Sequence, residues 1–366
     1  MHVGLLIYGS LETLSGGYLY DRMLVRYLRR QGDEVTLVSL PWRSYGQHLL
    51  DNANRRLLRW LQAARFDVLL QDELNHPSLA WLNSRLRRQV TYPLLAVVHH
   101  LRWLETRPGR LGTLQNRFYR QVERRYLASV DGFVYNSQAT RAAVTGLVGG
   151  SRPGVVAYPA GNRFTHLPTP DEILARATRP GPLRLLFVGN LIPRKGLHQL
   201  LAALARLPRP TWQLTVVGRP DVDPAYARAV RQQMLRAGLD NQVFFTGPLP
   251  DPALAAQFGR AQLLVMPSSY EGFGIVYLEG MAFGLPALAT PAGGARELVT
   301  AGENGYLVDP DDPAGLAAHL LHLHTHRHEL ARLSLAAQQR YLAHPTWDES
   351  MSRIRNFVLT FKRTNR

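Results

Sequence analysis

The chain contains no cysteine and almost no lysine. Without cysteine among its 366 residues it can form neither disulfides nor thiolate metal sites, and no thiol can act as a nucleophile. This composition fits a reducing cytoplasm. No run approaches the roughly 20 apolar residues that cross a bilayer. The start, MHVGLLIYGS, lacks a basic leader and a cleavage site, so we interpret it as a first strand.

The charge of the chain comes almost entirely from arginine. Only Lys195 and Lys362 are lysines among 43 basic residues, and the net charge is +16. Up to Phe164 there are 22 arginines and 11 acidic residues, a net charge of +11. Neither a recognition helix nor an aromatic ribonucleoprotein motif accompanies this charge, so we expect no nucleic-acid partner. An anionic lipid surface or a phosphorylated substrate explains it better.

Length and patterning indicate an α/β protein of two domains. Apolar residues make up 46% and charged residues 19%, which is typical of globular chains. In the first half, short apolar runs alternate with amphipathic segments of helix length, such as 17–31 and 111–129. This alternation predicts βαβ units and a parallel sheet, which binds ligands beyond its carboxyl edge. The expected strands are 3–8, 34–39, 68–71, 94–99, 132–136 and 155–158.

The same alternation restarts after a proline-rich stretch. Pro168, Pro170, Pro180 and Pro182 mark a linker, and the runs LRLLFVG, WQLTVVG, QVFFTG, AQLLVMP and LPALAT follow it. We therefore predict two Rossmann-like domains facing each other across a cleft, 1–165 on the acceptor side and 166–346 for nucleotide-sugar binding. An amphipathic helix at 347–361 has no strand after it, so 347–366 must pack on a domain already formed.

Two glutamates carry the densest chemical signal. Glu271 and Glu279 are separated by seven residues in SSYEGFGIVYLEGMAFGLPALATPAGGARELV. If Glu279 lies two turns into the helix that follows, both carboxylates reach one ligand across the helix N-terminus. Gly272, Phe273 and Gly274 would open that helix with free N–H groups suited to a diphosphate. Either glutamate alone is also typical of a helix start, where the macrodipole favours acids.

A second segment supports a phosphate ligand. In LLFVGNLIPRKGLHQLL, Arg194 and Lys195 occupy a turn between a strand and a helix, where cations can bind phosphates. A solvated charge pair is the alternative. In a chain that otherwise uses arginine, a lysine in this turn indicates that a compact charge is required.

These segments resemble glycosyltransferase family 4, the retaining enzymes of GT-B fold also called glycosyl transferases group 1. The resemblance rests on FVGNLIPRKG, FTGPLP, PSSYEGFGIVYLEGMAFGLPALAT, the glycines of PAGGARELV and NGYLVDPDD, in the family's order. It implies transfer of a sugar from a nucleotide-diphosphate sugar to an acceptor hydroxyl, in carbohydrate biosynthesis, with retained anomeric configuration. It further implies that there is no cofactor, that no metal is essential, and that a C-terminal helix crosses back to the first domain.

The resemblance also implies roles for individual residues. Glu271 would contact the donor sugar's hydroxyls, Glu279 the ribose and Lys195 the diphosphate, while Gly16 and Gly17 would form a loop near phosphate and acceptor. One departure is that the family often has arginine where this chain has Asn190, so Arg194 or Arg219 would supply that charge. The donor-binding candidates are thus Arg194, Gly16, Gly17, Gly272, Phe273, Gly274, Glu279, Gly218 and Arg219.

In the first domain, His99 and His100 follow a strand in AVVHHL. Members of the family place a histidine there near the reacting carbon of the donor, and by position we prefer His99. Together with Glu271 and Lys195 it completes the catalytic candidates. Ser137 in YNSQATR is better interpreted as a helix N-cap.

Three other patterns have simpler explanations than a ligand site. In HLHTHRHEL only His322 with His326, or His324 with His328, share a helix face, so we expect an exposed histidine-rich helix and not a metal site. Asp309, Asp311 and Asp312 fit a turn and a helix start. The helix at 54–65 carries Arg55, Arg56, Arg59 and Arg65 beside Leu57, Leu58, Trp60 and Leu61. It either contacts anionic lipid peripherally or packs its leucines on its own sheet.

Two further functions remain open on these residues. Another GT-B-fold enzyme, a sugar-nucleotide epimerase or a phosphorylase, would share the fold without this spacing of Glu271 and Glu279 beside Arg194 and Lys195. A non-catalytic sugar-nucleotide-binding protein would keep the fold without turnover. A nicotinamide dehydrogenase is the least favoured function, because no G-x-G-x-x-G follows the first strand.

Overall fold

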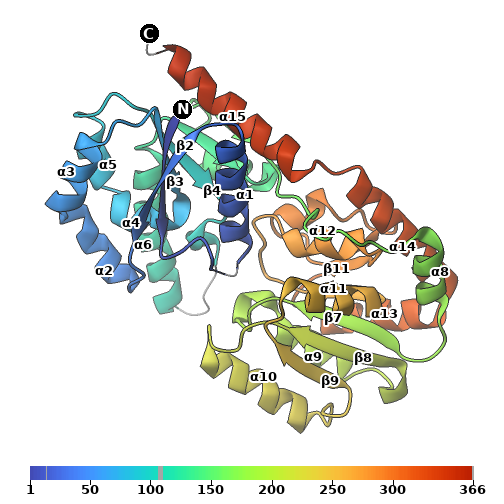
Figure 1. The fold of residues 1–366 in the computed structure, drawn as a ribbon. Coiled ribbons are helices and arrows are strands. Elements are labelled where there is room, and N and C mark those ends of the chain that lie inside the picture. The colour runs from blue at the N-terminus through green and yellow to red at the C-terminus, as the bar shows by residue number, and fades with distance from the viewer. Residues whose placement is uncertain (14, 106–109, 365–366) are drawn as a thin grey trace. The chain divides into compact units, whose positions relative to one another are not determined.

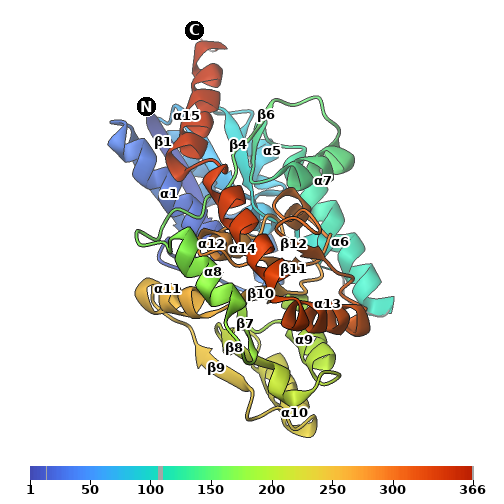
Figure 2. The same cartoon turned by 90° about the vertical axis from the view of Figure 1, so that its right-hand side faces the viewer.

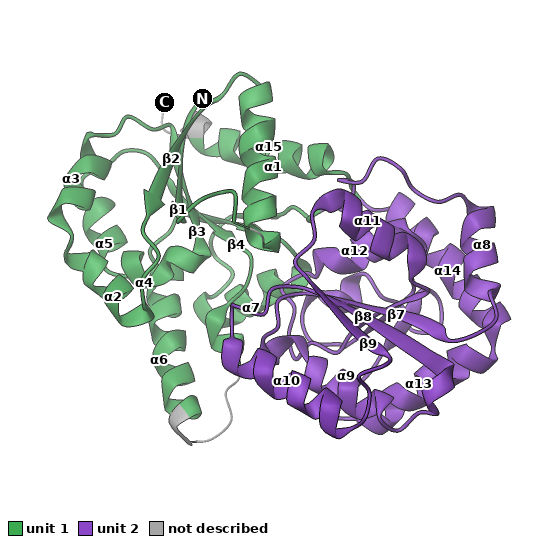
Figure 3. Cartoon of the chain, turned by 60° about the horizontal axis from the view of Figure 1, so that its bottom comes forward, with its two compact units in different colours: residues 1–159, 345–366 green, residues 160–344 purple. Residues whose placement is uncertain are grey.

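The computed structural model describes residues 1–13, 15–105 and 110–364 and divides into two compact units (Figures 1 and 3). Unit 1 comprises residues Met1–Pro159 and Pro345–Arg366, and unit 2 comprises Ala160–His344. The chain therefore passes from unit 1 to unit 2 after Pro159 and returns after His344. The last two residues of the expected C-terminal segment, 365 and 366, lie outside the described residues.

Unit 1 is built on a six-stranded, wholly parallel sheet in the order β2-β1-β3-β4-β5-β6. Its central strands are buried on both faces, which explains why LLAVV of β4 is apolar throughout instead of alternating. The strands are β1 His2–Tyr8, β2 Glu34–Leu40, β3 Val68–Asp72, β4 Leu94–Val98, β5 Gly132–Tyr135 and β6 Gly154–Val156.

Helices cover both faces of this sheet (Figure 1). One core cluster joins side chains of β1, β3, β4 and β5 to those of α3 to α7, for example Leu69, Ala96 and Phe133 to Leu61 and Tyr126. Helix α7 begins at Gln138, and the hydroxyl of the preceding Ser137 accepts a hydrogen bond from the Thr140 N–H at 2.9 Å, so the predicted N-cap is confirmed. The helices are α1 Gly16–Arg30, α2 Tyr45–Leu50, α3 Arg55–Ala63, α4 His76–Leu79, α5 Leu82–Leu86, α6 Arg110–Leu127, α7 Gln138–Val148 and α15 Trp347–Thr364.

Unit 2 has a second six-stranded parallel sheet, in the order β12-β11-β10-β7-β8-β9. Numbered within the unit this is 6-5-4-1-2-3, the order of a doubly wound Rossmann fold. The two parallel sheets with their helices confirm the predicted Rossmann-like architecture. The strands are β7 Leu183–Val188, β8 Trp212–Val217, β9 Val243–Gly247, β10 Leu263–Met266, β11 Ala287–Ala289 and β12 Gly305–Leu307.

Two elements of unit 2 differ from the sequence-based prediction. The proline-rich stretch was interpreted as a linker, which is wrong, because Pro170–Thr178 forms helix α8. Thr169 and Glu172 close a capping box there, and proline is favourable in a first helical turn. The three-residue strand β12 was not among the predicted strands. The remaining helices are α9 Leu197–Leu204, α10 Pro224–Arg236, α11 Asp251–Arg260, α12 Ile275–Ala282, α13 Pro313–Thr325 and α14 Arg327–Leu342.

The C-terminal helix α15 packs beside α1 within unit 1 (Figures 1 and 2). Trp347, Met351, Ile354 and Val358 recur at helical spacing and are all buried. On the flank of this stripe, the Arg355 Nε donates to the Asp33 carboxylate at 2.7 Å. Among the described residues, no helix is long and apolar enough to cross a membrane.

We expect Ile354→Ala to destabilise the protein, because it leaves a cavity under α15. The free energy of unfolding should fall by about 2–4 kcal/mol, measured by urea denaturation followed by circular dichroism. Asn356→Ala, on the exposed face of the same helix, is the matched control and should change it by no more than about 0.5 kcal/mol. Equal stability of the two variants would show that α15 is not part of the core of unit 1.

Candidate functional site

The topology of unit 2 places two loops at the point where its strand order reverses. Strands β7 and β10 are neighbours, although they are the first and fourth strands of the unit. The connection after β7 leads through α9 to β8, and the one after β10 leads through α12 to β11, on the other side of this strand pair. Open α/β sheets bind ligands at the carboxyl ends of their strands at such a reversal. Residues 189–196 follow β7 and residues 267–274 follow β10. These are the segments that the sequence selected.

An ion-pair cluster joins the two loops. The Lys195 Nζ lies 2.6 Å from Glu271 Oε1, and the Arg194 Nη1 lies 3.4 Å from Glu271 Oε2. Arg194 Nη1 also donates to the Tyr270 carbonyl at 2.7 Å. The Glu271 side chain is 8% exposed and that of Lys195 15%, so the contacts are made with little water present. The structure thus brings together three of the predicted site residues.

Burial and charge compete in this cluster. Burial raises the pKa of the Glu271 carboxyl, but the charges of Lys195 and Arg194 and the hydrogen bond from Lys195 outweigh it and lower the pKa to about 2. Burial also lowers the pKa of the Lys195 ammonium, against the opposing effect of Glu271. Glu271 is therefore a carboxylate at neutral pH, held between two cations.

Close backbone contacts fix the positions of the two loops. Lys195 ends the short 3-10 helix η4 Pro193–Lys195, and Gly196 follows with φ +72°, a left-handed conformation. A Cβ at Gly196 would lie 2.0 Å from the Pro267 carbonyl oxygen, so only glycine allows this approach. The Ser269 N–H then donates to the Arg194 carbonyl at 2.8 Å, which ties the loop after β10 to the loop after β7.

The second predicted glutamate lies elsewhere in the same unit. Helix α12 begins at Ile275, with Gly274 as its N-cap, so Glu279 lies just over one turn into the helix and not two as expected. Gly272 and Phe273 precede the helix and are buried, with the Phe273 ring centroid 5.7 Å from that of His344. Gly274, at φ +89°, faces Tyr277 so closely that a Cβ would lie 2.5 Å from that ring.

Glu279 is paired with an arginine that the sequence analysis missed. Arg163 Nε lies 2.6 Å from Glu279 Oε1, and Arg163 Nη1 lies 2.6 Å from Asp251 Oδ1. Burial raises the pKa of the Glu279 carboxyl, and the Arg163 charge opposes this increase. The signal in the sequence was a lone arginine after a strand, which in an arginine-rich chain points to no particular partner.

Two further candidates lie at the end of β8. Arg219 forms a surface pair with Asp221, with Nη2 2.6 Å from Oδ2, so it is Arg194 and not Arg219 that reaches Glu271. A Cβ at Gly218 would lie 1.9 Å from the Gly189 carbonyl oxygen. Glycine is thus required here by the close approach of the ends of β7 and β8, whatever contact it makes with a ligand.

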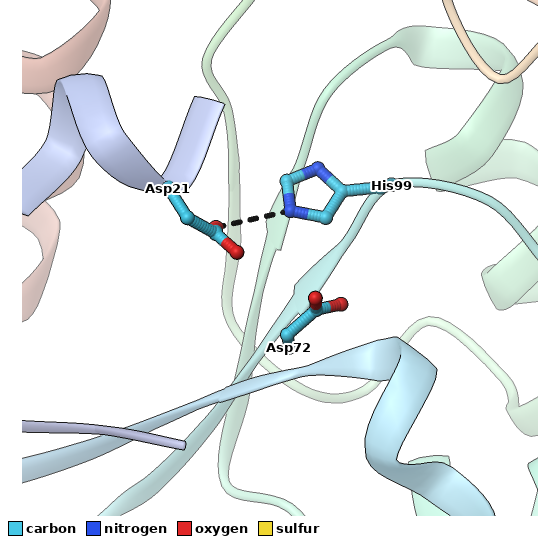
Figure 4. Close-up of side chains that lie close together, drawn as sticks. All are labelled: Asp21, Asp72 and His99. Carbon is cyan, nitrogen blue, oxygen red and sulfur yellow. Dashed lines mark hydrogen bonds and ion pairs between the residues drawn. The ribbon is translucent and has the colours of Figure 1, made fainter. Parts of the chain in front are cut away.

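Unit 1 has its own strand-order reversal, between β1 and β3, and a second polar cluster lies there (Figure 4). His99 directly follows β4, and its Nε2 lies 3.1 Å from Asp21 Oδ1 of α1. Asp72 ends β3, and one ligand atom of each of the three side chains lies within 4.8 Å of the others. Gly16 and Gly17 form the first turn of α1, behind the N-cap Ser15, so they do not form the expected loop.

A second buried cluster of acidic and histidine side chains includes Glu73, the residue after Asp72. The ligand atoms of Glu73, His76 and Glu123 lie within 4.8 Å of one another, and His76 Nδ1 is 3.0 Å from Glu73 Oε1. Burial is the main cause that raises the pKa of both the Glu73 and the Glu123 carboxyl to about 8. Both groups have donor atoms of metal-binding type, and buried oxygens of Asp21, Asp72 and Glu73 have no hydrogen-bond partner among the described residues.

The histidine-rich segment is not the single helix that was predicted, because α13 ends at Thr325 and α14 begins at Arg327. His326 lies between the two helices, its ring stacks on that of His322 at 4.2 Å between centroids, and His322 pairs with Glu329 at the surface. Asp312 caps α13, with its Oδ1 accepting from the Gly315 N–H at 2.9 Å. His100 lies 3.2 Å from Glu105 and not in the cluster of His99.

Comparison with known proteins assigns both halves of the chain to the same class. Residues 171–340 match the family "Glycosyl transferases group 1", and residues 18–161 match "Glycosyl transferase 4-like domain". A glycogen synthase of Mycobacterium tuberculosis is 31% identical over 298 residues, covering 80% of this chain and 67% of that protein. A D-inositol 3-phosphate glycosyltransferase of Acidothermus cellulolyticus is 28% identical over 295 residues, covering 75% of this chain and 64% of that protein.

Solved structures share the fold over the whole chain. The sucrose-phosphate synthase of Thermosynechococcus elongatus superimposes with a TM-score of 0.84 at 21% identity, covering 99% of both chains. The Anabaena protein HepE, in complex with UDP and glucose, gives a TM-score of 0.74 at 21% identity, covering 98% of this chain and 99% of that one. Together with the family matches, these findings show that the chain is a glycosyltransferase of family 4 with the GT-B fold.

Proposed function

We propose that the enzyme transfers a sugar from a nucleoside-diphosphate sugar to an acceptor hydroxyl, with retention of anomeric configuration and without an essential metal. The observation that carries this proposal is the convergence of Lys195 and Arg194 on Glu271 at the strand-order reversal of unit 2. Two cations at this edge of the sheet supply the positive charge that a departing diphosphate needs. In many other sugar transferases a divalent metal supplies that charge.

Donor binding would exchange partners within the cluster. The diphosphate competes for Lys195 and Arg194, which at present neutralise Glu271. The carboxylate is then available to accept hydrogen bonds from sugar hydroxyls. In the step itself, the acceptor oxygen forms a bond to the anomeric carbon on the face from which the diphosphate leaves. The leaving diphosphate oxygen accepts the proton of the acceptor hydroxyl, so no enzyme nucleophile is required.

The relatives favour a nucleoside-diphosphate hexose as donor. HepE has been crystallised with UDP and with UDP-glucose, and the closely aligned relatives are named as a glycogen synthase and inositol-phosphate glycosyltransferases. The family match favours transfer over epimerisation, phosphorolysis or binding without turnover. We propose Glu279 as the contact for the ribose, which would require Arg163 to release this carboxylate.

We also propose that unit 1 contacts anionic membranes peripherally, through α3. Arg55, Arg56 and Arg59 are exposed, and Trp60 is 46% exposed. Leu57 and Leu61 of this helix are buried in the core of unit 1 and do not face a membrane. Among the apolar side chains of α3, Trp60 is exposed and Leu58 is partly buried, so attraction would be chiefly electrostatic.

Lys195→Ala should weaken the binding of a nucleoside diphosphate by about 10- to 100-fold, because a charge-assisted contact to phosphate is lost. Binding of the corresponding nucleoside should change little. Isothermal titration calorimetry with both ligands gives the comparison, and Arg206→Ala, an exposed site after α9, is the control for charge. Equal losses for diphosphate and nucleoside would rule out phosphate contact by Lys195.

Transfer should continue after chelation of divalent metals. We expect a panel of nucleotide sugars with EDTA to give a product whose anomeric configuration, measured by NMR, matches that of the donor.

Glu271→Gln should reduce kcat/KM by at least about 100-fold with the circular dichroism spectrum unchanged. Loss of activity in EDTA that added Mg²⁺ or Mn²⁺ restores, or a product of inverted configuration, would refute the corresponding part of the mechanism.

Binding to anionic vesicles should depend on α3 and on salt. With Arg55, Arg56 and Arg59 all changed to Ser, sedimentation with phosphatidylglycerol vesicles should decrease several-fold at low salt. Wild-type binding should weaken as the screening length shortens to about 8 Å at physiological ionic strength. The control changes Arg206, Arg228 and Arg236 of unit 2 to Ser, with the same loss of charge. Equal effects of the two triple variants would remove α3 from membrane contact.

A further inference from the structure

The cluster around His99 holds a histidine ring against acidic groups at the carboxyl edge of the unit 1 sheet. Its members come from three elements that are far apart in sequence, α1, β3 and the turn after β4 (Figure 4). The side chain of Asp21 is fully buried, that of His99 is 9% exposed, and Asp72 is also fully buried. A buried carboxylate beside an imidazole is costly unless the two exchange a proton or form an ion pair.

The orientation of the ring is fixed from several sides. A Cβ at Gly17 would lie 3.4 Å from His99 Cδ2, so the first turn of α1 passes directly along the ring. The Tyr20 ring meets it edge-on, with 5.0 Å between centroids. Asn136 Nδ2 donates to the His99 carbonyl at 2.7 Å and holds the backbone. With Nε2 directed at Asp21, the ring has one orientation.

This orientation leaves the other ring nitrogen for a ligand. In Figure 4 the second nitrogen, Nδ1, points away from both carboxylates. Among the residues that the structure describes, Nδ1 has no hydrogen-bond partner, whereas Nε2 has Asp21. Helix α1 begins, and β4 ends, at the edge of the sheet where parallel folds bind ligands. Nδ1 therefore lies where a ligand oxygen could reach it.

Charge decides whether Nδ1 carries a proton. Burial by itself lowers the pKa of His99, but Asp21, through its charge and its hydrogen bond, and Asp72 and Glu73, through their charges, raise it to about 9. Burial and the Asp21 charge raise the pKa of Asp72 to about 7. The tyrosines that face the cluster, Tyr18 and Tyr20, are neutral because burial raises their pKa far above neutral pH. Asp21 is the group in direct contact with the ring.

We infer that Asp21 is a positioning residue that holds His99 as an imidazolium, with Nε2–H bound to Asp21 and Nδ1–H presented as a cationic donor to an oxygen of the bound substrate. Without a carboxylate at position 21, burial would favour the neutral ring, which has one proton for two nitrogens. Asp21 of α1 thus determines the positive charge of the His99 ring that contacts the ligand, as well as the orientation of that ring. That the oxygen belongs to a sugar substrate rests on the proposed function.

The test replaces the carboxylate by its neutral isostere. In full-length protein labelled with ¹⁵N-histidine, the His99 ring should be doubly protonated at pH 8 in the wild type. In Asp21→Asn it should be singly protonated at the same pH. Glu34→Gln, an exposed loss of one negative charge in the same unit, is the matched control and should leave the wild-type titration unchanged. A singly protonated His99 in the wild type at pH 8 would overturn the inference even if Asp21→Asn failed to fold.

The pH dependence of turnover gives a second readout. Wild-type kcat/KM should decrease on the alkaline side only near pH 9, and in Asp21→Asn this limb should move below neutral pH. At pH 8 the variant should then lose about tenfold or more, with partial recovery in acid. A loss that is the same at every pH would show a merely structural role for Asp21. If no nucleotide sugar is turned over but the NMR titration behaves as stated, the proposed function fails and the positioning role stands.

Discussion

Parallel strand pairing is the constraint on which both candidate sites depend. Every strand of each sheet runs in the same direction, so the carboxyl ends of all strands of a unit lie along one edge. Residues that are distant in sequence reach that edge independently, each in the segment that follows its own strand. Lys195 and Glu271 are 76 positions apart, and Asp21 and His99 are 78 apart, yet each pair is in direct contact. At the strand-order reversal the connections diverge, and polar side chains can occupy the edge without displacing a core helix.

In both sites a buried ionisable side chain is paired with side chains of opposite charge. The buried side chain is an acid in unit 2 and a base in unit 1. In unit 2 a buried carboxylate is held ionised by two cations, and in unit 1 a buried histidine is held charged by carboxylates. Each arrangement compensates for the desolvation of its groups in the absence of substrate. A ligand that replaces one partner must therefore offer either charge of the same sign or hydrogen bonds to the group left behind, and this favours substrates with phosphate or densely hydroxylated groups over apolar ones.

Much of the architecture could be predicted from the sequence, because the apolar runs are short, regularly spaced and flanked by amphipathic segments. The prediction failed where local rules compete. Prolines at 168–182 suggested a linker, whereas Thr169 and Glu172 cap a helix that accepts Pro170 in its first turn. Lys195, Glu271 and His99 were found as individual candidates by motif. Arg163, the partner of Glu279, and Asp21 and Asp72, the neighbours of His99, were not predicted. A single acid or arginine in the sequence does not reveal its partner, which depends on how strand order and register bring distant positions together.

The scarcity of lysine has a practical consequence for chemical labelling. Reagents that acylate primary amines have only Lys195, Lys362 and the N-terminal amine to modify, and that amine is paired with Asp33 at 2.8 Å. Burial lowers the pKa of Lys195, so a larger fraction of it is the nucleophilic free amine than in an ordinary lysine. Apart from Lys362, attachment of a dye or of biotin through lysine would thus modify the carboxyl edge of the unit 2 sheet. Protection of Lys195 from such a reagent offers a direct way to observe occupancy of that edge by mass spectrometry.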